Sequence, residues 1–363
     1  MPRLLIVALG ALGATLLEAS ARRGVFDEII VATRSPERVL AKINNARIGA
    51  ALEGHYPQIR VAPFDMYAPN AGAELQALHP DVIFASPSML PWWRLPNVAP
   101  PLRTHIADAP FATFLPLHLA PMLALQRAMH SSGLDCPWIG ASYPDVVNHV
   151  LACIGAPPTC GTGNLQEAIP KVHFSLQHLA DYAPEKLRVW LVAQHAFEYF
   201  CYASTASEAT PPYLLRAELG GRDVSAEARA SMFTPFPIPY ELDLNNITVS
   251  ASLSIIEALA GANGIDTHVP APNGMLGGYP VRVDASGVKL RLDEHWPIAQ
   301  AVATNRASLP FDGIAEIATD GTVLFSDATA RVLTQITGQT TDALAPADVP
   351  RLAATMYAKL TKA

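Results

Sequence analysis

Length, composition and charge narrow the class of protein. The chain has 363 residues, of which 50% are hydrophobic and 16% charged, and a formal net charge of −7. So many apolar residues exclude a disordered chain, and scattered basic residues under a negative net charge argue against nucleic-acid binding. No apolar stretch runs unbroken for the roughly 20 residues of a membrane span, and no signal-peptide layout opens the chain. We expect a cytoplasmic enzyme of two domains, without membrane contact.

The four cysteines indicate neither a disulfide frame nor a metal site. Cys136, Cys153, Cys160 and Cys201 form no C-x-x-C pair and have no metal-ligand spacing. We expect reduced, mostly buried thiols and no metal ion.

The first 35 residues predict the opening unit of a dinucleotide-binding sheet. Residues 4–9 are a continuous apolar run, typical of a strand covered on both faces. A glycine turn, an alanine-rich helix over 14–23 and a second strand over 28–32 follow. In such units the turn lets the backbone approach a pyrophosphate at the helix start, although Ala8 stands where the usual G-x-G-x-x-G pattern has its first glycine. The candidate cofactor contacts are Gly10, Ala11, Leu12 and Gly13.

The end of the second strand indicates which dinucleotide binds. An NAD site normally has Asp or Glu there for the ribose hydroxyls, whereas a 2′-phosphate requires a cation and no acid. The residues here are Thr33, Arg34 and Ser35. Because a guanidinium can hold a phosphate through two hydrogen bonds, we predict NADP as the cofactor. The alternative is that Arg34 is a solvated surface residue.

Three more strands, over 59–62, 81–85 and 137–141, complete the predicted parallel sheet. We expect helices over 71–78 and 118–132, but only a helix start and then an irregular connection over 36–54, because Asn44, Asn45 and Gly49 weaken a helix. Small residues follow the fourth and fifth strands, at the edge where such sheets hold the riboses of the cofactor; they are Ser86, Pro87 and Ser142. The long segment 89–116 is typical of a lid.

Beyond residue 143 the alternation of strand and helix stops, which predicts a second domain. We expect a buried strand over 189–193 and antiparallel hairpins that turn at 284–287 and 320–321. Helices are expected over 145–154, 176–182, 226–232, 248–260 and, with a break, 328–363. The predicted fold class is α/β, with an N-terminal Rossmann-type doubly wound parallel sheet (residues 1–143) followed by an α+β substrate and oligomerisation domain (residues 144–363). We expect a homodimer.

Four segments resemble the lactate/malate dehydrogenase superfamily. Ser142-Tyr143-Pro144-Asp145 is similar to the Asn-Pro-x-Asp turn that ends that family's fifth strand, and residues 161–166 (GTGNLQ) are similar to its Gly-Thr-x-Leu-Asp segment. Residues 192–196 (VAQHA) are similar to the strand end that carries the family's catalytic histidine, here His195. Residues 277–288 are similar to its late pair of strands, so the resemblance spans most of the chain. It implies a nicotinamide-dependent dehydrogenase.

The chain departs from that family at two functional positions. Gln166 stands where the family has the acid that orients the imidazole, and Ile169 stands where it has the carboxylate-binding arginine. Without that arginine a simple 2-oxo acid loses its bidentate partner, which argues against lactate or malate as the substrate. Candidate substrate-binding residues that could replace it are Arg94, Arg103 and Lys171, with Trp93 closing over the substrate.

His195 is the predicted proton donor or acceptor, with Gln166 and Tyr199 beside it in the catalytic set. The alternative for His195 is a core histidine whose hydrogen bonds are satisfied. Because Gln166 carries no charge, we expect the imidazole to titrate near or below its usual pKa of about 6.5.

Three functions fit these residues. The leading hypothesis is an NADP-dependent oxidoreductase that transfers hydride to or from a small carbonyl, imine or secondary alcohol. An opine- or saccharopine-type reductase is the second. The third is a nucleotide-binding protein without catalytic activity, which the loss of the family's Asp and Arg makes plausible.

Overall fold

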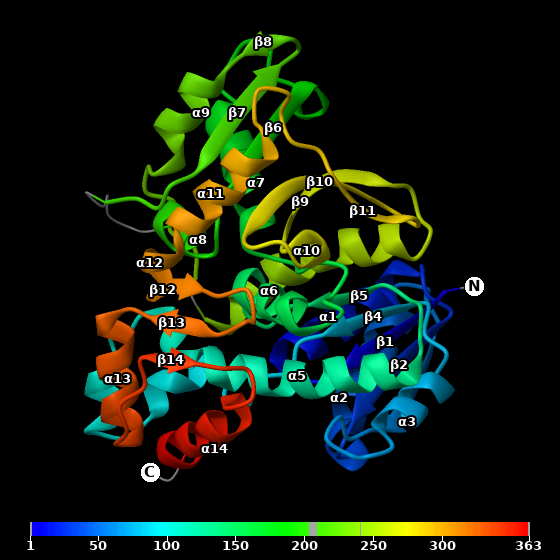
Figure 1. Cartoon of the computed structure of the whole chain (residues 1–363). Helices are drawn as coiled ribbons and strands as arrows, with labels where there is room; N and C mark the ends of the chain where they lie inside the picture. Colours follow the sequence, from blue (N-terminus) through cyan, green and yellow to red (C-terminus); the bar gives the residue numbers. More distant parts are fainter. Residues whose placement is uncertain (1, 203–208, 240, 362–363) are drawn as a thin grey trace.

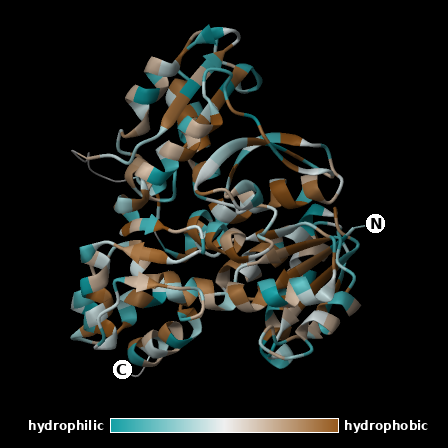
Figure 2. Ribbon diagram, viewed as in Figure 1, coloured by the Kyte–Doolittle hydropathy of each residue, from teal (hydrophilic) through white to brown (hydrophobic). Residues whose placement is uncertain are grey.

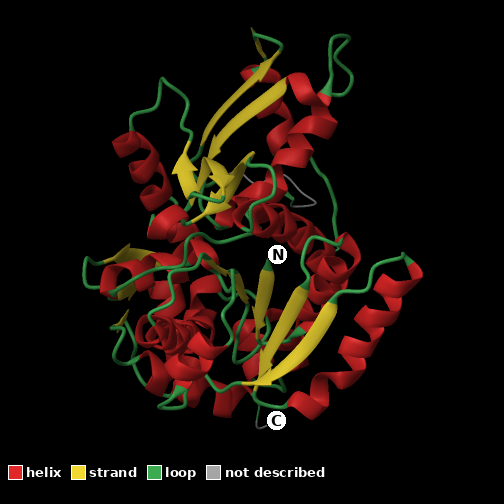
Figure 3. Cartoon of the chain, turned by 90° about the vertical axis from the view of Figure 1, so that its right-hand side faces the viewer, coloured by secondary structure: helices red, strands yellow, loops and turns green. Residues whose placement is uncertain are grey.

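The computed structural model describes residues 2–202, 209–239 and 241–361. Its N-terminal half is built on one parallel sheet (Figures 1 and 3). The strand order of this sheet is β3-β2-β1-β4-β5. The strands are β1 (Arg3–Val7), β2 (Glu28–Thr33), β3 (Gln58–Pro63), β4 (Val82–Ala85) and β5 (Trp138–Gly140). This confirms the predicted Rossmann-type sheet.

The continuous apolar run in β1 is explained by burial on both faces of the sheet. Leu4 and Ile6 point into one core with α1 (Ala11–Arg23) and α2 (Pro36–Leu52). Leu5 and Val7 point into the other core with α3 (Ala71–Ala77) and α5 (Leu115–Ser132). Figure 2 shows these central strands as apolar. Helices on both faces are what a parallel sheet requires.

The predicted break after the start of the second helix is wrong, because α2 runs unbroken for 17 residues. Its supposed breakers face α1: Asn45 Nδ2 donates to Glu18 Oε1 at 2.7 Å. A Cβ at Gly49 would lie 2.5 Å from Arg22 Nη2, so glycine here makes room for the side chain of the neighbouring helix. Tertiary packing therefore overrides local propensity.

The segment between β4 and α5 is not simply a loop. It contains the short helices η1 (Trp92–Asn97), α4 (Leu102–Ile106) and η2 (Phe111–Phe114).

Three small antiparallel sheets follow, in agreement with the predicted α+β half. Their strands are β6 (Leu187–Val192), β7 (Leu214–Leu219) and β8 (Arg222–Asp223); β9 (Ile265–Pro270), β10 (Gly278–Asp284) and β11 (Gly287–Leu290); and β12 (Ile314–Ile317), β13 (Val323–Phe325) and β14 (Ala343–Leu344). The helices are α6 (Pro144–Ile154), α7 (Leu165–Leu176), α8 (Ala196–Cys201), α9 (Ser225–Met232), α10 (Asn245–Leu259), α11 (Ile298–Ala307), α12 (Leu309–Asp312), α13 (Asp327–Thr337) and α14 (Val349–Leu360). The helix expected over 176–182 is wrong, since α7 ends where it was expected to begin.

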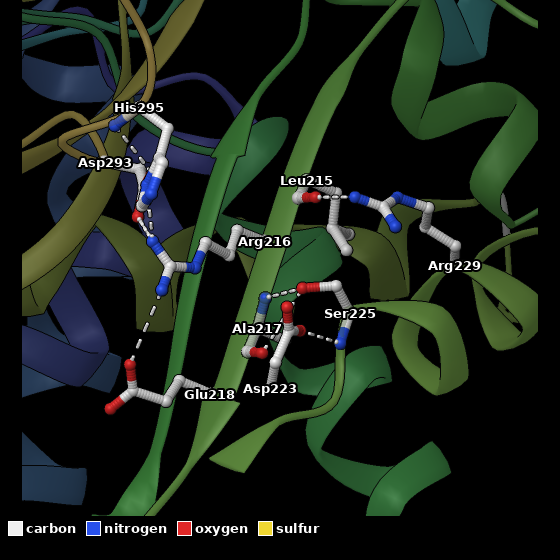
Figure 4. Close-up of polar contacts among 9 residues, drawn as sticks. All are labelled: Leu215, Arg216, Ala217, Glu218, Asp223, Ser225, Arg229, Asp293 and His295. Atoms are coloured by element: carbon white, nitrogen blue, oxygen red, sulfur yellow. Dashed lines mark hydrogen bonds and ion pairs between the residues drawn. The ribbon is translucent and has the colours of Figure 1, made fainter. Parts of the chain in front are cut away.

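Polar contacts tie β7 to the chain after β11 (Figure 4). Arg216 Nη1 donates to Asp293 Oδ2 at 2.6 Å and lies 2.8 Å from His295 Nδ1. Arg229 from α9 donates to the carbonyl of Leu215 at 2.8 Å on the other side of the strand.

The C-terminal segment packs against the N-terminal half of the chain rather than against the rest of the C-terminal half. Helices α13 and α14 and strands β12 to β14 lie beside α5 and the lid segment (Figure 1). Leu309, Ile314, Leu333, Leu352 and Met356 share one apolar core with the α5 face of the parallel sheet. The boundary at residue 143 stays a prediction, and this shared core couples the two parts.

Candidate active site

A large cavity opens at the carboxyl edge of the parallel sheet. Its volume is about 1500 Å³, larger than the roughly 300–1,000 Å³ of a typical small-ligand pocket. The glycine turn, the ends of β2, β4 and β5, the lid helices, and the starts of α7 and α8 all line it. It therefore has room for a dinucleotide and a second small molecule.

The glycine turn has the backbone that a dinucleotide site needs. Ala8 has a φ of 69°, the left-handed conformation that the first glycine of the usual motif would adopt. A Cβ at Gly10 would meet nothing within 4 Å, whereas one at Gly13 would lie 2.6 Å from the Ala8 carbonyl oxygen. Gly10, Ala11 and Leu12 line the cavity at the start of α1, and Gly13 does not. Gly13 is thus a packing residue, and the space beside Gly10 is open.

The end of β2 lines the same cavity through Thr33, Arg34 and Ser35. Arg34 is exposed, and the Ser35 amide donates to Thr33 Oγ1 at 3.3 Å. Among the described residues, Glu167 and Glu198 are the only Asp or Glu that line the cavity, and both belong to the helices of the second half. The β2 end of the cavity therefore has a cation and no carboxylate.

The loops after β4 and β5 meet at the cavity wall. Ser142 Oγ donates to the carbonyl of Pro87 at 2.7 Å, and Ser86 is beside it with a buried hydroxyl that has no hydrogen-bond partner in the described chain. All three residues line the cavity, and their contact with the riboses stays a prediction.

His195 lies at the start of α8, and its acid partner is Asp312 rather than Gln166. His195 Nδ1 is 2.9 Å from Asp312 Oδ1 and 3.0 Å from Oδ2. Tyr143 OH and Gln194 Nε2 donate to Asp312 Oδ2 at 2.9 and 2.7 Å. With an imidazole, a phenol and an amide around it, the buried carboxylate is held in one orientation.

Asp312 is the last residue of α12, and Gly313 caps that helix with a φ of 88°. A Cβ at Gly313 would lie 2.2 Å from Thr329 Oγ1, so glycine is required both for the turn and for the packing of α13. Asp312 is missing from the sequence-based set because it lies 117 residues from His195 and in no motif.

The predicted titration of His195 near or below 6.5 is wrong. Burial lowers its pKa, but the charge and hydrogen bond of Asp312, together with the charges of Asp145 and Glu198, outweigh this and raise the pKa to about 9. The imidazole is therefore protonated at neutral pH, with Nδ1–H donated to Asp312. A cation that lines the cavity can give a proton to an oxygen that gains negative charge.

Gln166 and Lys171 lie outside the cavity lining. Gln166 Nε2 donates to Ser254 Oγ at 3.0 Å and makes no hydrogen bond to His195. Lys171, 1% exposed, donates to the carbonyls of Cys201, Met232 and Thr234, so its ammonium holds the chain together and is not free for a substrate.

Of the remaining candidates, Trp93, Arg103 and Tyr199 line the cavity, and Arg94 does not. Tyr199 is 65% exposed. Arg103, a candidate to replace the family's carboxylate-binding arginine, lies in the lid helix α4 and is exposed.

Further acids near His195 are absent from the predicted site residues. Asp145, fully buried, accepts from Asn164 Nδ2, and burial above all raises its pKa to about 6. Glu167 and Glu198 also line the cavity. Asp145 belongs to the segment that resembles the family's Asn-Pro-x-Asp turn, and Glu198 lies three residues after His195 in α8. Neither position by itself assigns a function to the residue.

No metal site or membrane span accompanies this cavity in the part of the chain that the structure describes. Within it, no group of His, Cys, Asp or Glu could hold a metal ion, and no helix is long and apolar enough to cross a bilayer. The four cysteines are free.

Neither a scan against protein-family models nor a search of curated protein sequences finds a match. Solved structures do match. Malate dehydrogenase from Plasmodium falciparum is 11% identical with a TM-score of 0.56, and the match covers 86% of this chain and 100% of that one. Malate dehydrogenase from Archaeoglobus fulgidus in complex with NADH is 12% identical with a TM-score of 0.55, covering 85% and 98%. Lactate dehydrogenase from Eimeria maxima with NADH and oxamate is 10% identical with a TM-score of 0.55, covering 85% and 91%.

At these identities the comparison establishes the fold. The chain has a lactate/malate dehydrogenase-like fold, as the four resembling segments predicted.

Proposed function

We propose that this chain is an NADP-dependent oxidoreductase acting on a small carbonyl, imine or secondary alcohol. The observation that carries the proposal is that the glycine turn, Arg34 and the His195–Asp312 pair belong to one cavity. The structural neighbours that contain NADH support a nicotinamide cofactor for this fold. The preference for NADP rests on the residues of this chain alone.

The residues of the turn fit a dinucleotide. The open space beside Gly10 admits a pyrophosphate, and the amides at the start of α1 can donate to it. Ser86, Pro87 and Ser142 border the ribose region, and Arg34 would pair with a 2′-phosphate. When bound, the reduced nicotinamide supplies the hydride for the reaction.

His195 supplies the proton. As the carbonyl carbon accepts hydride, its oxygen gains negative charge, and the protonated imidazole gives it a proton, leaving an alcohol and a neutral imidazole. Asp312 holds the ring by Nδ1 and stabilises its charge before the transfer. In the reverse direction the neutral ring accepts the proton from the alcohol.

The structure weakens the case for a protein without catalytic activity. That case rested on the absence of the family's Asp and Arg, and Asp312 provides an acid in place of the first. Ile169, which stands at the position of the family's arginine, packs into the core of the second half, so that arginine has no substitute there. This argues against lactate or malate as the substrate. An opine- or saccharopine-type reductase stays an alternative, and the cytoplasmic location and the homodimer stay predictions.

The test is to titrate the protein with NADPH and NADH, and then to follow NADPH consumption with a panel of ketones, imines and 2-oxo acids. We expect tighter binding of NADPH and turnover with at least one neutral or cationic carbonyl compound. Failure of both dinucleotides to bind would refute the proposal.

A further inference from the structure

Two glutamates line the cavity beside His195 and have no part in the proton transfer described above. Glu167 comes from α7 and Glu198 from α8, and the charge of Glu167 contributes to raising the pKa of Glu198. Glu167 is 4% exposed, yet its Oε1 has no hydrogen-bond partner among the described residues. A buried carboxylate oxygen without a partner is costly, which indicates a missing donor.

A third acid adds to the negative charge at this end of the cavity. Asp145 is fully buried, and while its Oδ2 accepts from Asn164, its Oδ1 has no partner in the described chain. Asn164 itself lines the cavity between Asp145 and the start of α7. Burial, followed by the charge of Glu167, raises the pKa of Glu198 well above its usual value, and the charge of His195 offsets this only in part.

The charge of His195 lowers the pKa of both Asp145 and Glu198, but this one cation does not balance three acids. Of the arginines and lysines that the structure describes, Arg34 and Arg103 line the cavity, one at the end of β2 and the other in the lid. His195 is already paired with Asp312, and burial lowers the pKa of His118 to about 4, which leaves that ring neutral. The cation must therefore come with a ligand.

We propose that the substrate carries an ammonium group, bound by Glu167 and Glu198, close to the carbonyl or hydroxyl group that meets His195. This inference rests on the proposed function and gives it a substrate class: amino ketones and the corresponding amino alcohols. An ammonium has three donors, enough for both glutamates and for a third cavity-lining acceptor such as Thr248 or Asn164. The same acids disfavour a carboxylate at this position through like-charge repulsion.

Three probes with the same secondary alcohol test the charge preference: isopropanolamine, propylene glycol and lactate, in which the carbinol carbon carries an ammoniomethyl, a hydroxymethyl or a carboxylate group. Each is titrated by calorimetry into NADPH-loaded protein, in which an alcohol binds without reacting. We expect isopropanolamine to bind about 10- to 100-fold more tightly than propylene glycol, with lactate weakest. Equal or tighter binding of propylene glycol or lactate would overturn the inference.

Variants localise the effect. Glu167→Gln and, separately, Glu198→Gln should each weaken isopropanolamine binding by about 10-fold or more and leave propylene glycol unchanged. Glu185→Gln, an exposed residue outside the cavity lining, is the matched control. Circular dichroism of each variant shows whether it folds, and the second glutamate keeps the test valid if one variant does not. An amine preference that survives both substitutions would overturn the assignment.

The two proposals fail in different ways. The affinity for NADPH is measured first on the same samples. If NADPH does not bind, the proposed function fails, and the three probes are then titrated into the cofactor-free protein to decide the amine inference. If NADPH binds and the amine is not preferred, the amine inference alone fails.

Discussion

Asp312 Oδ1 lies 2.9 Å from His195 Nδ1, although the two residues are 117 positions apart. This contact joins the C-terminal segment to the start of α8 and raises the pKa of His195, the histidine that we propose for proton transfer. A change in how the C-terminal segment packs on α5 should therefore alter the position of Asp312 and, through it, the pKa of His195.

Asp312→Asn tests this contact. The amide keeps the shape but not the charge, so the pKa of His195 should fall from about 9 toward its usual value of about 6.5. Reduction at about pH 8 should then be roughly 30-fold slower than in the wild type, and the two rates should converge toward about pH 5. NMR titration of the ring and the pH profile of turnover measure this, with Asp320→Asn as a surface control. An unchanged profile would mean that Asp312 is not the group that charges His195.

His195→Ala removes the proposed proton donor. Turnover should drop by about 100- to 10,000-fold, while the affinity for the dinucleotide changes little, because the ring acts on the substrate. Steady-state kinetics and equilibrium binding separate the two effects. Near-normal turnover would move the role to another residue, with Tyr199 the next to test.

The two glycines of the turn should respond in opposite ways. Gly10→Val should keep the fold and abolish dinucleotide binding, since its side chain would fill the open space that a pyrophosphate needs. Gly13→Ala should instead destabilise the protein by about 1–3 kcal/mol, because the added carbon would lie 2.6 Å from the Ala8 carbonyl oxygen. Thermal unfolding and NADPH titration of both variants form the test. A stable Gly10→Val protein that still binds NADPH would place the phosphates elsewhere.

The charge of Arg34 should set the cofactor preference. Arg34→Asp places an acid at the end of β2, where it can accept from ribose hydroxyls and repels a 2′-phosphate, so NADH should then bind more tightly than NADPH. Arg38→Asp, also exposed but outside the cavity lining, should leave the preference unchanged. If the wild type already binds both cofactors equally, Arg34 does not hold a phosphate.

The stability of the protein should depend on pH through Glu198. Its pKa is raised in the folded state by burial and then by Glu167, so the folded state is favoured when Glu198 is protonated. This contribution is present below the unfolded pKa of about 4.5 and is lost as the pH rises through the raised value. The Glu198→Gln variant should therefore melt at a higher temperature than the wild type at about pH 8, and the difference should be smaller at about pH 5. The change in the free energy of unfolding between the two pH values should be about 1 kcal/mol. A lower melting temperature at about pH 8 would contradict this.

The sequence predicted the parallel sheet because its signals are local. Residues 4–9 are apolar without alternation, and a strand buried on both faces needs that pattern. The order of residues after such strands also predicts where three features lie: the cavity-lining turn, Thr33 to Ser35, and His195. Their positions could be predicted without knowledge of any distant contact.

What could not be predicted depends on packing between distant segments. Asn45 and Gly49 weaken an isolated helix, but in α2 they accommodate Glu18 and Arg22 of α1. Gln166 occupies the family's acid position, while the acid that contacts His195 comes from α12, which no motif marks. Asp312 could not be predicted as the substitute acid, because a carboxylate can contact a histidine from any element that packs beside it.

The most direct measurement of the central claim follows the hydride itself. NADPH deuterated at the transferring position of its nicotinamide is incubated with the protein and a carbonyl panel that includes an amino ketone, and the alcohol product is examined by mass spectrometry. We predict deuterium on the carbinol carbon of the product, formed much more slowly by His195→Ala. Product without deuterium at that carbon, or no reduction of any compound by protein that binds NADPH, would contradict the account.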